Sequence, residues 1–333
     1  MKTQRIANWL AATTLAFSGS MAAAATYKWD MPNEYPGTSI QAEGDRYFSK
    51  KLNELSNGDI EIVHHFGSAL GFRSKDQLDA VMDGAVELAN TFVPSLGGVN
   101  PIFILFSLPF LVSTPEEAKT LYEISKPYQD KELEKYNQKL LFASPWPASG
   151  LWGKGPYTSM ADIRGLKMRS YDANSSRVFR DSKANPVQLS WADIVPQLST
   201  GGIDAVLTSL ESGLSASFND YTKFFTEIHY DSTINMVTMN LDTWNALSPE
   251  LQQAVNQAAQ EAETFVWQNL HTAIARNHDI AASRGMTVVT ELQPGFREEL
   301  QVISEPLIQA WADSMGKDGQ AIIETFRARI AAQ

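Results

Sequence analysis

The longest uninterrupted helical pattern in this chain of 333 residues begins at Ser248-Pro249-Glu250 and meets no glycine or proline before Gly285. A serine followed by proline and an early acidic residue is a strong helix start. About 37 residues with a rise of 1.5 Å each make a helix of roughly 55 Å, which is longer than one small domain. Such a helix either runs across two lobes or projects from the protein. A chain of this length also exceeds the usual size of one hydrophobic core, so we expect two lobes.

Ahead of that helix, segments with the period of strands alternate with segments typical of helices. The first unit is expected to contain strands at 26–31, 59–65 and 86–92 and helices at 39–55 and 74–82. The sequence Pro145-Trp146-Pro147 then breaks a strand at 140–143, as in a crossing between lobes. The second unit is expected to contain strands at 166–170 and 203–207 and helices at 175–182 and 191–198. This alternation predicts an α/β fold with mostly parallel sheets.

The first 25 residues have the features of a secretory signal. Lys2 and Arg5 precede an apolar stretch at 6–17, and Ala23-Ala24-Ala25 fits a cleavage site before Thr26. An amphipathic first helix is the alternative. We expect the mature chain to begin near Thr26 and to be exported.

The composition excludes several classes of function. Without residues 1–25 the formal charge falls from −11 to −13, so general electrostatics do not favour nucleic acid. The absence of cysteine excludes disulfides, thiol catalysis and thiolate metal sites. An acidic protein that holds an anion needs a local, fixed positive group.

Five motifs in a fixed order resemble a known family. They are GSALG (67–71), DGAVELA (83–89), DIRGLKMR (162–169), WADIVPQL (191–198) and GGID (201–204), followed by the long late helix. Together they are similar to the substrate-binding subunit of tripartite ATP-independent periplasmic (TRAP) transporters, the DctP family. The resemblance implies a two-lobed periplasmic binding protein fold, type II-like, with the long helix in both lobes. It also implies a periplasmic receptor that hands its ligand to membrane permease subunits driven by an ion gradient.

On this basis we expect a definite division of the chain. Residues 1–25 are the signal, residues 26–147 plus about 234–270 form lobe I, and residues 148–233 plus about 271–333 form lobe II. We expect a monomer without cofactor or metal.

Arg169 is the strongest candidate for a ligand contact. It ends a short apolar strand, and ligands of open α/β sheets lie beyond the carboxyl ends of strands. A guanidinium pairs with both oxygens of a carboxylate. From position alone, an ion pair at the surface or between lobes is the favoured explanation. The resemblance implies that Arg169 is the family's arginine that forms the main salt bridge to the ligand's carboxylate.

Departures from the family pattern favour a less polar ligand. Where many members carry a second arginine, this chain has Leu151 or Trp152, and Thr208 stands near the position of a common asparagine. Thr91-Phe92 replaces a polar group at the end of an early strand. Trp191 matches a family position that packs on the ligand, and Trp146, Trp152 and Phe92 either line the same crevice or belong to the core. We expect a monocarboxylate with an apolar or aromatic body.

Further candidates are polar. Asn33 and Glu34 follow the first strand in a Pro-rich loop that is either a cavity wall or a plain turn. Asp172, Thr208 and Glu211 supply either secondary ligand contacts or turns and helix caps.

Enzyme and metal sites find little support. The chain has no G-x-S-x-G or phosphate-loop motif. His64 and His65 are neighbours on a strand and point to opposite faces, while His271 and His278 are too far apart to share one ion without other ligands. A secreted hydrolase or lyase using Glu34, Asp172 or Glu211 stays open as the rival class, as does an ABC-type receptor.

Overall fold

The computed structural model describes residues 25–332. The expected signal at residues 1–25 lies outside them except for Ala25, and it stays a prediction. None of the helices within 25–332 combines the length and apolar character needed to cross a membrane.

The first lobe contains the strands β1 to β4 and β10. Strands β1 to β4 all end on the side of the lobe where the chain crosses to the second lobe. Strand β1 pairs with β2 in parallel, and β10 lies between β3 and β4. A parallel bridge between Asn33 and Asn90 joins β1 to β3. The elements are β1 (Tyr27–Pro32), α1 (Ile40–Leu55), β2 (Ile60–His65), α2 (Ser74–Met82), β3 (Leu88–Phe92), η1 (Val93–Leu96), η2 (Pro101–Ser107), α3 (Pro115–Glu134), β4 (Gln138–Pro145), β10 (Ile234–Asn240) and α8 (Leu241–Asn245).

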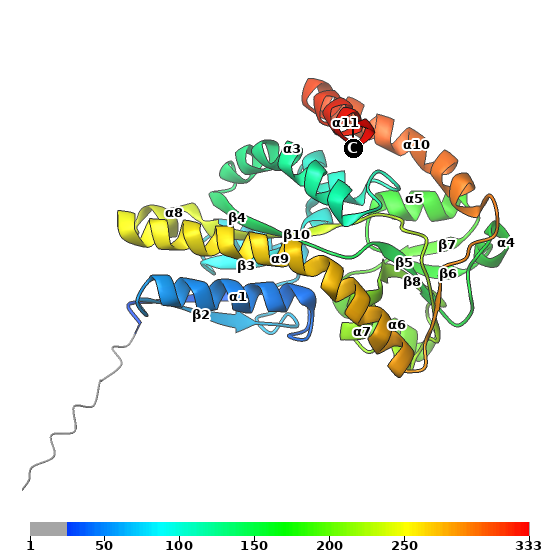
Figure 1. The fold of residues 1–333 in the computed structure, drawn as a ribbon, viewed down its shortest axis with the longest axis horizontal. Helices are drawn as coiled ribbons and strands as arrows, with labels where there is room; N and C mark the ends of the chain where they lie inside the picture. The colour runs from blue at the N-terminus through cyan, green and yellow to red at the C-terminus, as the bar shows by residue number, and fades with distance from the viewer. Residues whose placement is uncertain (1–24, 333) are drawn as a thin grey trace, which may run out of the picture.

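The second lobe contains a six-stranded sheet of order β11-β9-β5-β8-β6-β7. Figure 1 shows this sheet on the right, with α5 on one side and α6 and α7 on the other. Its elements are β5 (Ser149–Gly153), α4 (Met160–Ile163), β6 (Lys167–Ser170), α5 (Ala173–Asp181), β7 (Asn185–Gln188), η3 (Trp191–Asp193), α6 (Ile194–Thr200), β8 (Ala205–Ser209), α7 (Leu210–Ser215), η4 (Phe218–Asp220), β9 (Phe224–Thr226) and β11 (Thr287–Val289).

The expectation of mostly parallel sheets needs correction. Strand β10 runs antiparallel to β3 and β4, and β5 runs antiparallel to β8 and β9. Both strands lie next to the crossings between the lobes, β5 just after the first and β10 just after the second. The chain therefore enters each sheet from the other lobe rather than through a helical crossover, so a parallel direction is not imposed.

The long helix is confirmed as α9 (Pro249–Ser283), which has 35 residues and the Ser248 cap. Its buried residues join three apolar clusters in succession along its length. Ala254 to Ala262 pack against α1, Val266 and Trp267 join the cluster around α3, and Leu270 to Ala281 join the cluster around Trp152 and Leu214. The helix thus packs on both lobes, as Figure 1 shows by its course across the molecule.

The last two helices differ from the expected division. In α10 (Phe296–Ser314), Phe296 and Leu300 join the core of the second lobe, but Trp311 joins that of the first. In α11 (Gly316–Ala331), Ile322 and Phe326 pack in the cluster around α3. The boundaries remain a proposal, and in it we move residues from about 308 onward to lobe I, because their apolar side chains are buried there.

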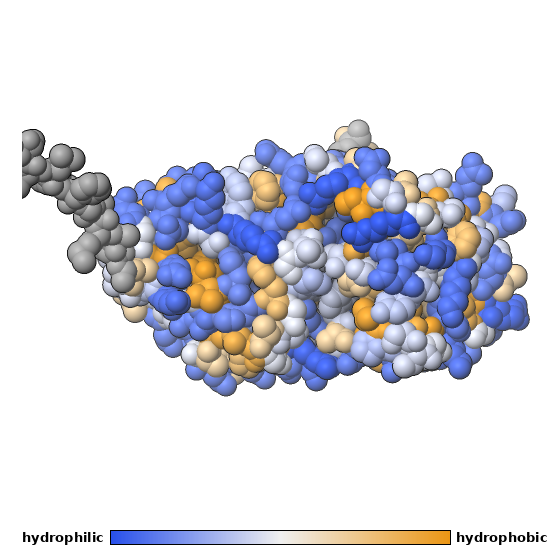
Figure 2. All heavy atoms as spheres, turned by 90° about the horizontal axis from the view of Figure 1, so that it is seen from below, coloured by the Kyte–Doolittle hydropathy of each residue, from blue (hydrophilic) through white to orange (hydrophobic). Residues whose placement is uncertain are grey.

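The exposed large hydrophobic side chains of the described residues are Leu70, Val99, Val187, Tyr221 and Val302. Figure 2 shows hydrophobic patches, surrounded by hydrophilic side chains, on the face seen from below. Scattered exposed apolar residues are ordinary on soluble proteins.

Candidate functional site

The cavity that contains Arg169 lies between the lobes and has two adjoining parts. The outer part has a volume of about 390 Å³ and the inner part about 10 Å³. Both are lined by the same four side chains, Tyr35, Phe92, Arg169 and Tyr171. We call the two parts together the binding cavity.

Arg169 lies on β6 with its side chain almost fully buried, at 4% exposure. Its Nε donates to the carbonyl of Leu189 at 3.1 Å and its Nη1 to the carbonyl of Leu207 at 3.0 Å. No carboxylate among residues 25–332 forms a salt bridge with it. Burial lowers the pKa of the guanidinium, and the surrounding Tyr35, Tyr171 and Glu34 act in the opposite direction. The side chain is therefore oriented by two carbonyls, but the described part of the chain gives it no anionic partner, which a buried charge requires.

Aromatic rings from both lobes enclose the guanidinium. The ring of Tyr35 lies with its centroid 4.6 Å from that of Trp146 and 4.9 Å from that of Trp191. Phe92 packs edge-on against Tyr171 at 5.8 Å, and Arg169 lies over Tyr171 at 5.5 Å. Trp191, Phe92 and Trp146 thus lie on the wall of this cavity. These rings offer a flat, apolar enclosure for the body of a ligand.

Hydroxyl groups line the inner part of the cavity. They belong to Ser149, Thr208, Ser209, Ser212 and Thr233, in addition to Tyr35 and Tyr171. Thr208 is 7% exposed and lies on β8, next to Leu207, which accepts from Arg169. A hydroxyl both donates and accepts, so this end of the cavity can bind an uncharged polar group.

Glu34, Arg73 and Lys75 are the charged side chains at the outer mouth, apart from Arg169 itself. Glu34 lines the cavity, where its Oε2 accepts from the Ser74 N–H at 3.0 Å and its buried Oε1 has no partner among the described residues. Arg73 forms a two-bond ion pair with Asp193 at 3.0 and 3.2 Å. Because Arg73 precedes α2 and Asp193 belongs to η3, this pair joins the two lobes across the mouth.

The other expected site residues do not line the binding cavity. Trp152 is fully buried, and its Nε1 donates to the carbonyl of Ser209 at 3.0 Å. Asn33 is fully buried beside Asp45. Asp172 caps α5 through the Ser175 N–H and accepts from the Ser107 hydroxyl. Glu211 accepts from the Ile40 N–H at 2.8 Å, at the start of α1, and burial raises its pKa to about 8. All four have partners that define structural roles.

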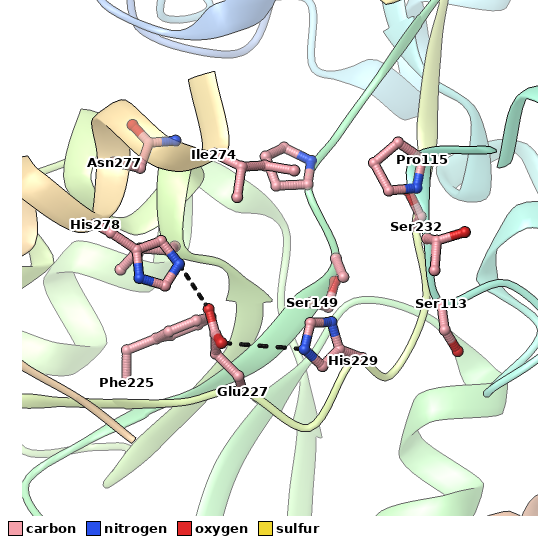
Figure 3. Close-up of a pocket in the computed structure, with 14 residues that line it drawn as sticks. Ser113, Pro115, Ser149, Phe225, Glu227, His229, Ser232, Ile274, Asn277 and His278 are labelled. Atoms are coloured by element: carbon pink, nitrogen blue, oxygen red, sulfur yellow. Dashed lines mark ion pairs between the residues drawn. The ribbon is translucent and has the colours of Figure 1, made fainter. Parts of the chain in front are cut away.

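A second cavity lies on the far side of the crossing strands. Ser232 and Pro147 line it, whereas their neighbours Thr233 and Trp146 line the binding cavity, as expected where adjacent side chains point to opposite faces. Figure 3 shows His278 and His229 pointing toward Glu227, with Nε2–carboxylate distances of 2.9 and 4.0 Å. Burial lowers the pKa of His229, and the Glu227 carboxylate is the acidic group that lines this cavity. This cavity is poorly suited to an anion.

The other three described histidines lie apart from one another's partners and from Glu227. His64 bonds to Ser49 and His65 to Asp30, while His271 pairs with Glu116. Within residues 25–332 no three histidine or carboxylate side chains are arranged to hold a metal ion.

The sequence analysis missed several cavity residues. Tyr35 and Tyr171 lie next to expected site residues, and Ser209, Ser212 and Thr233 carry the small hydroxyls. The position of Tyr171, two residues after Arg169 just beyond the end of β6, was the signal that could have identified it, because residues two apart on a strand share a face.

Comparison with known proteins gives a consistent result. The model of the DctP family, bacterial extracellular solute-binding protein family 7, matches residues 33–314. The crystal structure of DctP7, a Bordetella pertussis extracytoplasmic solute receptor binding pyroglutamic acid, is 29% identical with a TM-score of 0.86, and the match covers 90% of this chain and 99% of that one. A marine metagenome TRAP solute-binding protein specific for pyroglutamate is 27% identical with a TM-score of 0.85, covering 90% and 98%. The 2,3-diketo-L-gulonate-binding periplasmic protein YiaO of Escherichia coli (strain K12) is 26% identical over 284 residues, covering 83% of this chain and 84% of the relative. The family model matches most of the chain, which therefore belongs to the DctP family of TRAP solute-binding proteins.

Proposed function

We propose that this protein is a periplasmic receptor that captures a small, compact monocarboxylic acid, such as pyroglutamate, and delivers it to the membrane subunits of a TRAP transporter. The observation that carries the proposal is the buried Arg169 guanidinium, which lacks an anionic partner among the described residues. Lobe closure removes a ligand's carboxylate from water, and an oriented guanidinium compensates for that loss.

The preference for a single carboxylate follows from the charges around the cavity. Arg169 is the one charged side chain that lines the inner part. At the mouth, Arg73 is already paired with Asp193, and Glu34 adds a negative charge. A second carboxylate in the inner part would therefore be buried against hydroxyls and aromatic rings without a cation. The remaining basic side chain of the outer part, Lys75, is exposed to solvent.

The shape and polarity of the cavity support a small cyclic ligand. The rings of Tyr35, Trp146 and Trp191 offer flat apolar surfaces, and the hydroxyls of Thr208 and Ser209 can bind an amide. Pyroglutamate combines a carboxylate, a compact ring and a lactam amide. Two of the receptors compared above, at 27% and 29% identity, are described as binding it.

The alternative functions, a secreted hydrolase or lyase and an ABC-type receptor, gain no support. Glu34, Asp172 and Glu211 have separate partners and do not converge on one reaction centre. The family match favours a TRAP receptor over an ABC-type receptor.

The test is the identity and stoichiometry of the bound molecule. We expect mass spectrometry of the solute released from purified protein to show an unchanged monocarboxylic acid in a ratio of one to one. Calorimetric titration should then give tighter binding of L-pyroglutamate than of succinate or glucuronate. Tighter binding of succinate would contradict the proposed single carboxylate, and turnover of the solute would contradict the receptor function.

Removing the ion pair at the mouth should have a small effect on the rate of release. The Arg73 and Asp193 side chains are 37% and 44% exposed, and such pairs contribute about 0–1 kcal/mol. We expect Arg73→Ala to speed ligand dissociation by at most about fivefold, with the difference fading at high salt. Stopped-flow measurement of the dissociation rate checks this.

The matched control is Arg177→Ala, which removes an ion pair within α5. That variant should release ligand at the wild-type rate. If Arg73→Ala slows ligand dissociation, the pair does not hold the lobes together. The same conclusion follows if Asp193→Ala speeds dissociation further in the Arg73→Ala background.

A further inference from the structure

Two series of hydrogen bonds lead from the wall of the binding cavity to one buried carboxylate, that of Asp45. Asp45 lies on α1 with no exposed surface, and both of its oxygens accept from amide side chains. Its Oδ1 accepts from Asn90 Nδ2 at 2.6 Å, and its Oδ2 accepts from Asn33 Nδ2 at 2.7 Å. Burial raises the pKa of Asp45 to about 7, and the two amide donors act in the opposite direction.

The first series leads from Asp45 to the cavity wall. Asn90 on β3 accepts through Oδ1 from Asn235 Nδ2 at 2.6 Å, and Asn235 on β10 accepts through Oδ1 from the indole Nε1 of Trp146 at 2.7 Å. Both asparagines are fully buried. Trp146 lines the inner part of the cavity and packs on Tyr35.

The second series is shorter and reaches the neighbouring ring. Asn33 accepts through Oδ1 from the backbone N–H of Tyr35 at 2.9 Å. Tyr35 lines both parts of the cavity, and its ring lies between Trp146 and Trp191. The two aromatic residues that lobe I presents to this stack are therefore both connected to one carboxylate.

All the donors in both series point toward Asp45. An indole N–H and a backbone N–H can only donate, and an ionised carboxylate can only accept. These end groups fix the orientation of every asparagine amide between them. Each series of hydrogen bonds begins at a group that can only donate. The two series can therefore meet only at a group that accepts two hydrogen bonds.

We propose that Asp45 is a positioning residue for ligand recognition, which holds Trp146 and the Tyr35 backbone in place through the Asn90–Asn235 and Asn33 amides. This inference rests on the proposed function, since it concerns the walls of the same cavity. None of the connecting residues lines the cavity.

The substitution Asp45→Asn separates this role from general packing. Asparagine has nearly the same shape, but it offers one acceptor and one donor in place of two acceptors. One series must then reverse its amides, and the reversal ends with two donors facing each other at the Trp146 indole or the Tyr35 N–H. An unsatisfied buried donor is costly, and the strain falls on a residue of the cavity wall.

A double-mutant cycle in the full chain tests the connection. With L-pyroglutamate as the titrant, we expect Asp45→Asn to weaken binding about tenfold, which corresponds to about 1.4 kcal/mol. Trp146→Phe removes the indole donor and allows the first series to reverse freely. In the Trp146→Phe background, Asp45→Asn should therefore change affinity by less than about threefold. Equal effects in both backgrounds would overturn the proposal.

Two controls keep the result interpretable. Asp162→Asn removes an exposed carboxylate that also accepts backbone N–H bonds, and it should leave affinity unchanged. If Asp45→Asn does not fold, Asn235→Ala interrupts the first series instead, and its effect must likewise shrink in the Trp146→Phe background. If Asn235→Ala weakens binding as much in the Trp146→Phe background as it does alone, the proposal is also overturned.

The NMR resonance of the Trp146 indole N–H gives a readout that needs no ligand. In the ligand-free protein we expect Asp45→Asn to shift this resonance, assigned by its loss in Trp146→Phe, while Asp162→Asn leaves it in place. An unchanged resonance would overturn the positioning role even if the protein binds pyroglutamate. A shifted resonance without pyroglutamate binding would instead mean that the proposed ligand is wrong and the positioning role stands.

Discussion

Replacing Arg169 by alanine should weaken ligand binding by roughly 30- to 5000-fold while the receptor stays folded. Removing one partner of a buried, hydrogen-bonded charge pair costs about 2–5 kcal/mol, because the other charge is left buried and unpaired. Here that other charge is the ligand's carboxylate. Calorimetric titration of the variant and of wild type with the solute identified by mass spectrometry measures the loss.

Two further variants define the cause of that loss. Arg169→Lys should also bind poorly, because an ammonium cannot donate in the planar geometry that Leu189 and Leu207 hold for the guanidinium. Arg164→Ala should bind like wild type, since Arg164 is exposed beside α4. If Arg169→Ala binds within threefold of wild type, the ligand is not anchored as an anion, and the aromatic stack around Tyr35 becomes the main recognition element.

Replacing Trp152 by alanine should lower the free energy of unfolding by about 3–5 kcal/mol, the usual cost of removing a large buried aromatic side chain. The indole packs against Phe218 and Phe225 with centroid distances of 5.7 and 5.5 Å. It also lies so close to Gly213 that a Cβ there would stand 2.2 Å from the ring. Urea unfolding of the ligand-free protein measures the change.

The sequence left open whether Trp152 lies in the core or on the cavity wall. Ligand affinity distinguishes these two positions. We expect the folded Trp152→Ala protein to bind its ligand within a few-fold of wild type, because the side chain does not line the binding cavity. Trp244→Ala is the matched control, and it should cost much less stability because Trp244 is only half-buried. A large loss of affinity with little loss of stability would place Trp152 in the site after all.

Local sequence signals predicted the elements of the fold well. The capping sequence Ser248-Pro249-Glu250 marks the start of α9, where the Ser248 side chain accepts from the Leu251 N–H. Such caps act within four residues, so they can be recognised without the tertiary structure. The directions of β5 and β10 could not be recognised in this way, because they depend on which lobe the chain has just left.

For the site, the sequence by itself determined the position of Arg169 at the end of a short strand and, through the family motifs, its expected role. It also determined that α9 is long enough to join two lobes. Only the tertiary structure decided which polar and aromatic side chains face the cavity. Ser149 and Trp152 lie three residues apart on β5 and point to opposite faces, but the pattern does not say which face meets the other lobe. Likewise Glu211 and Asp45 are ordinary helix residues in the sequence, and their partners Ile40, Asn33 and Asn90 are brought to them by packing between distant segments, because a buried polar group takes whichever partner the fold places within reach.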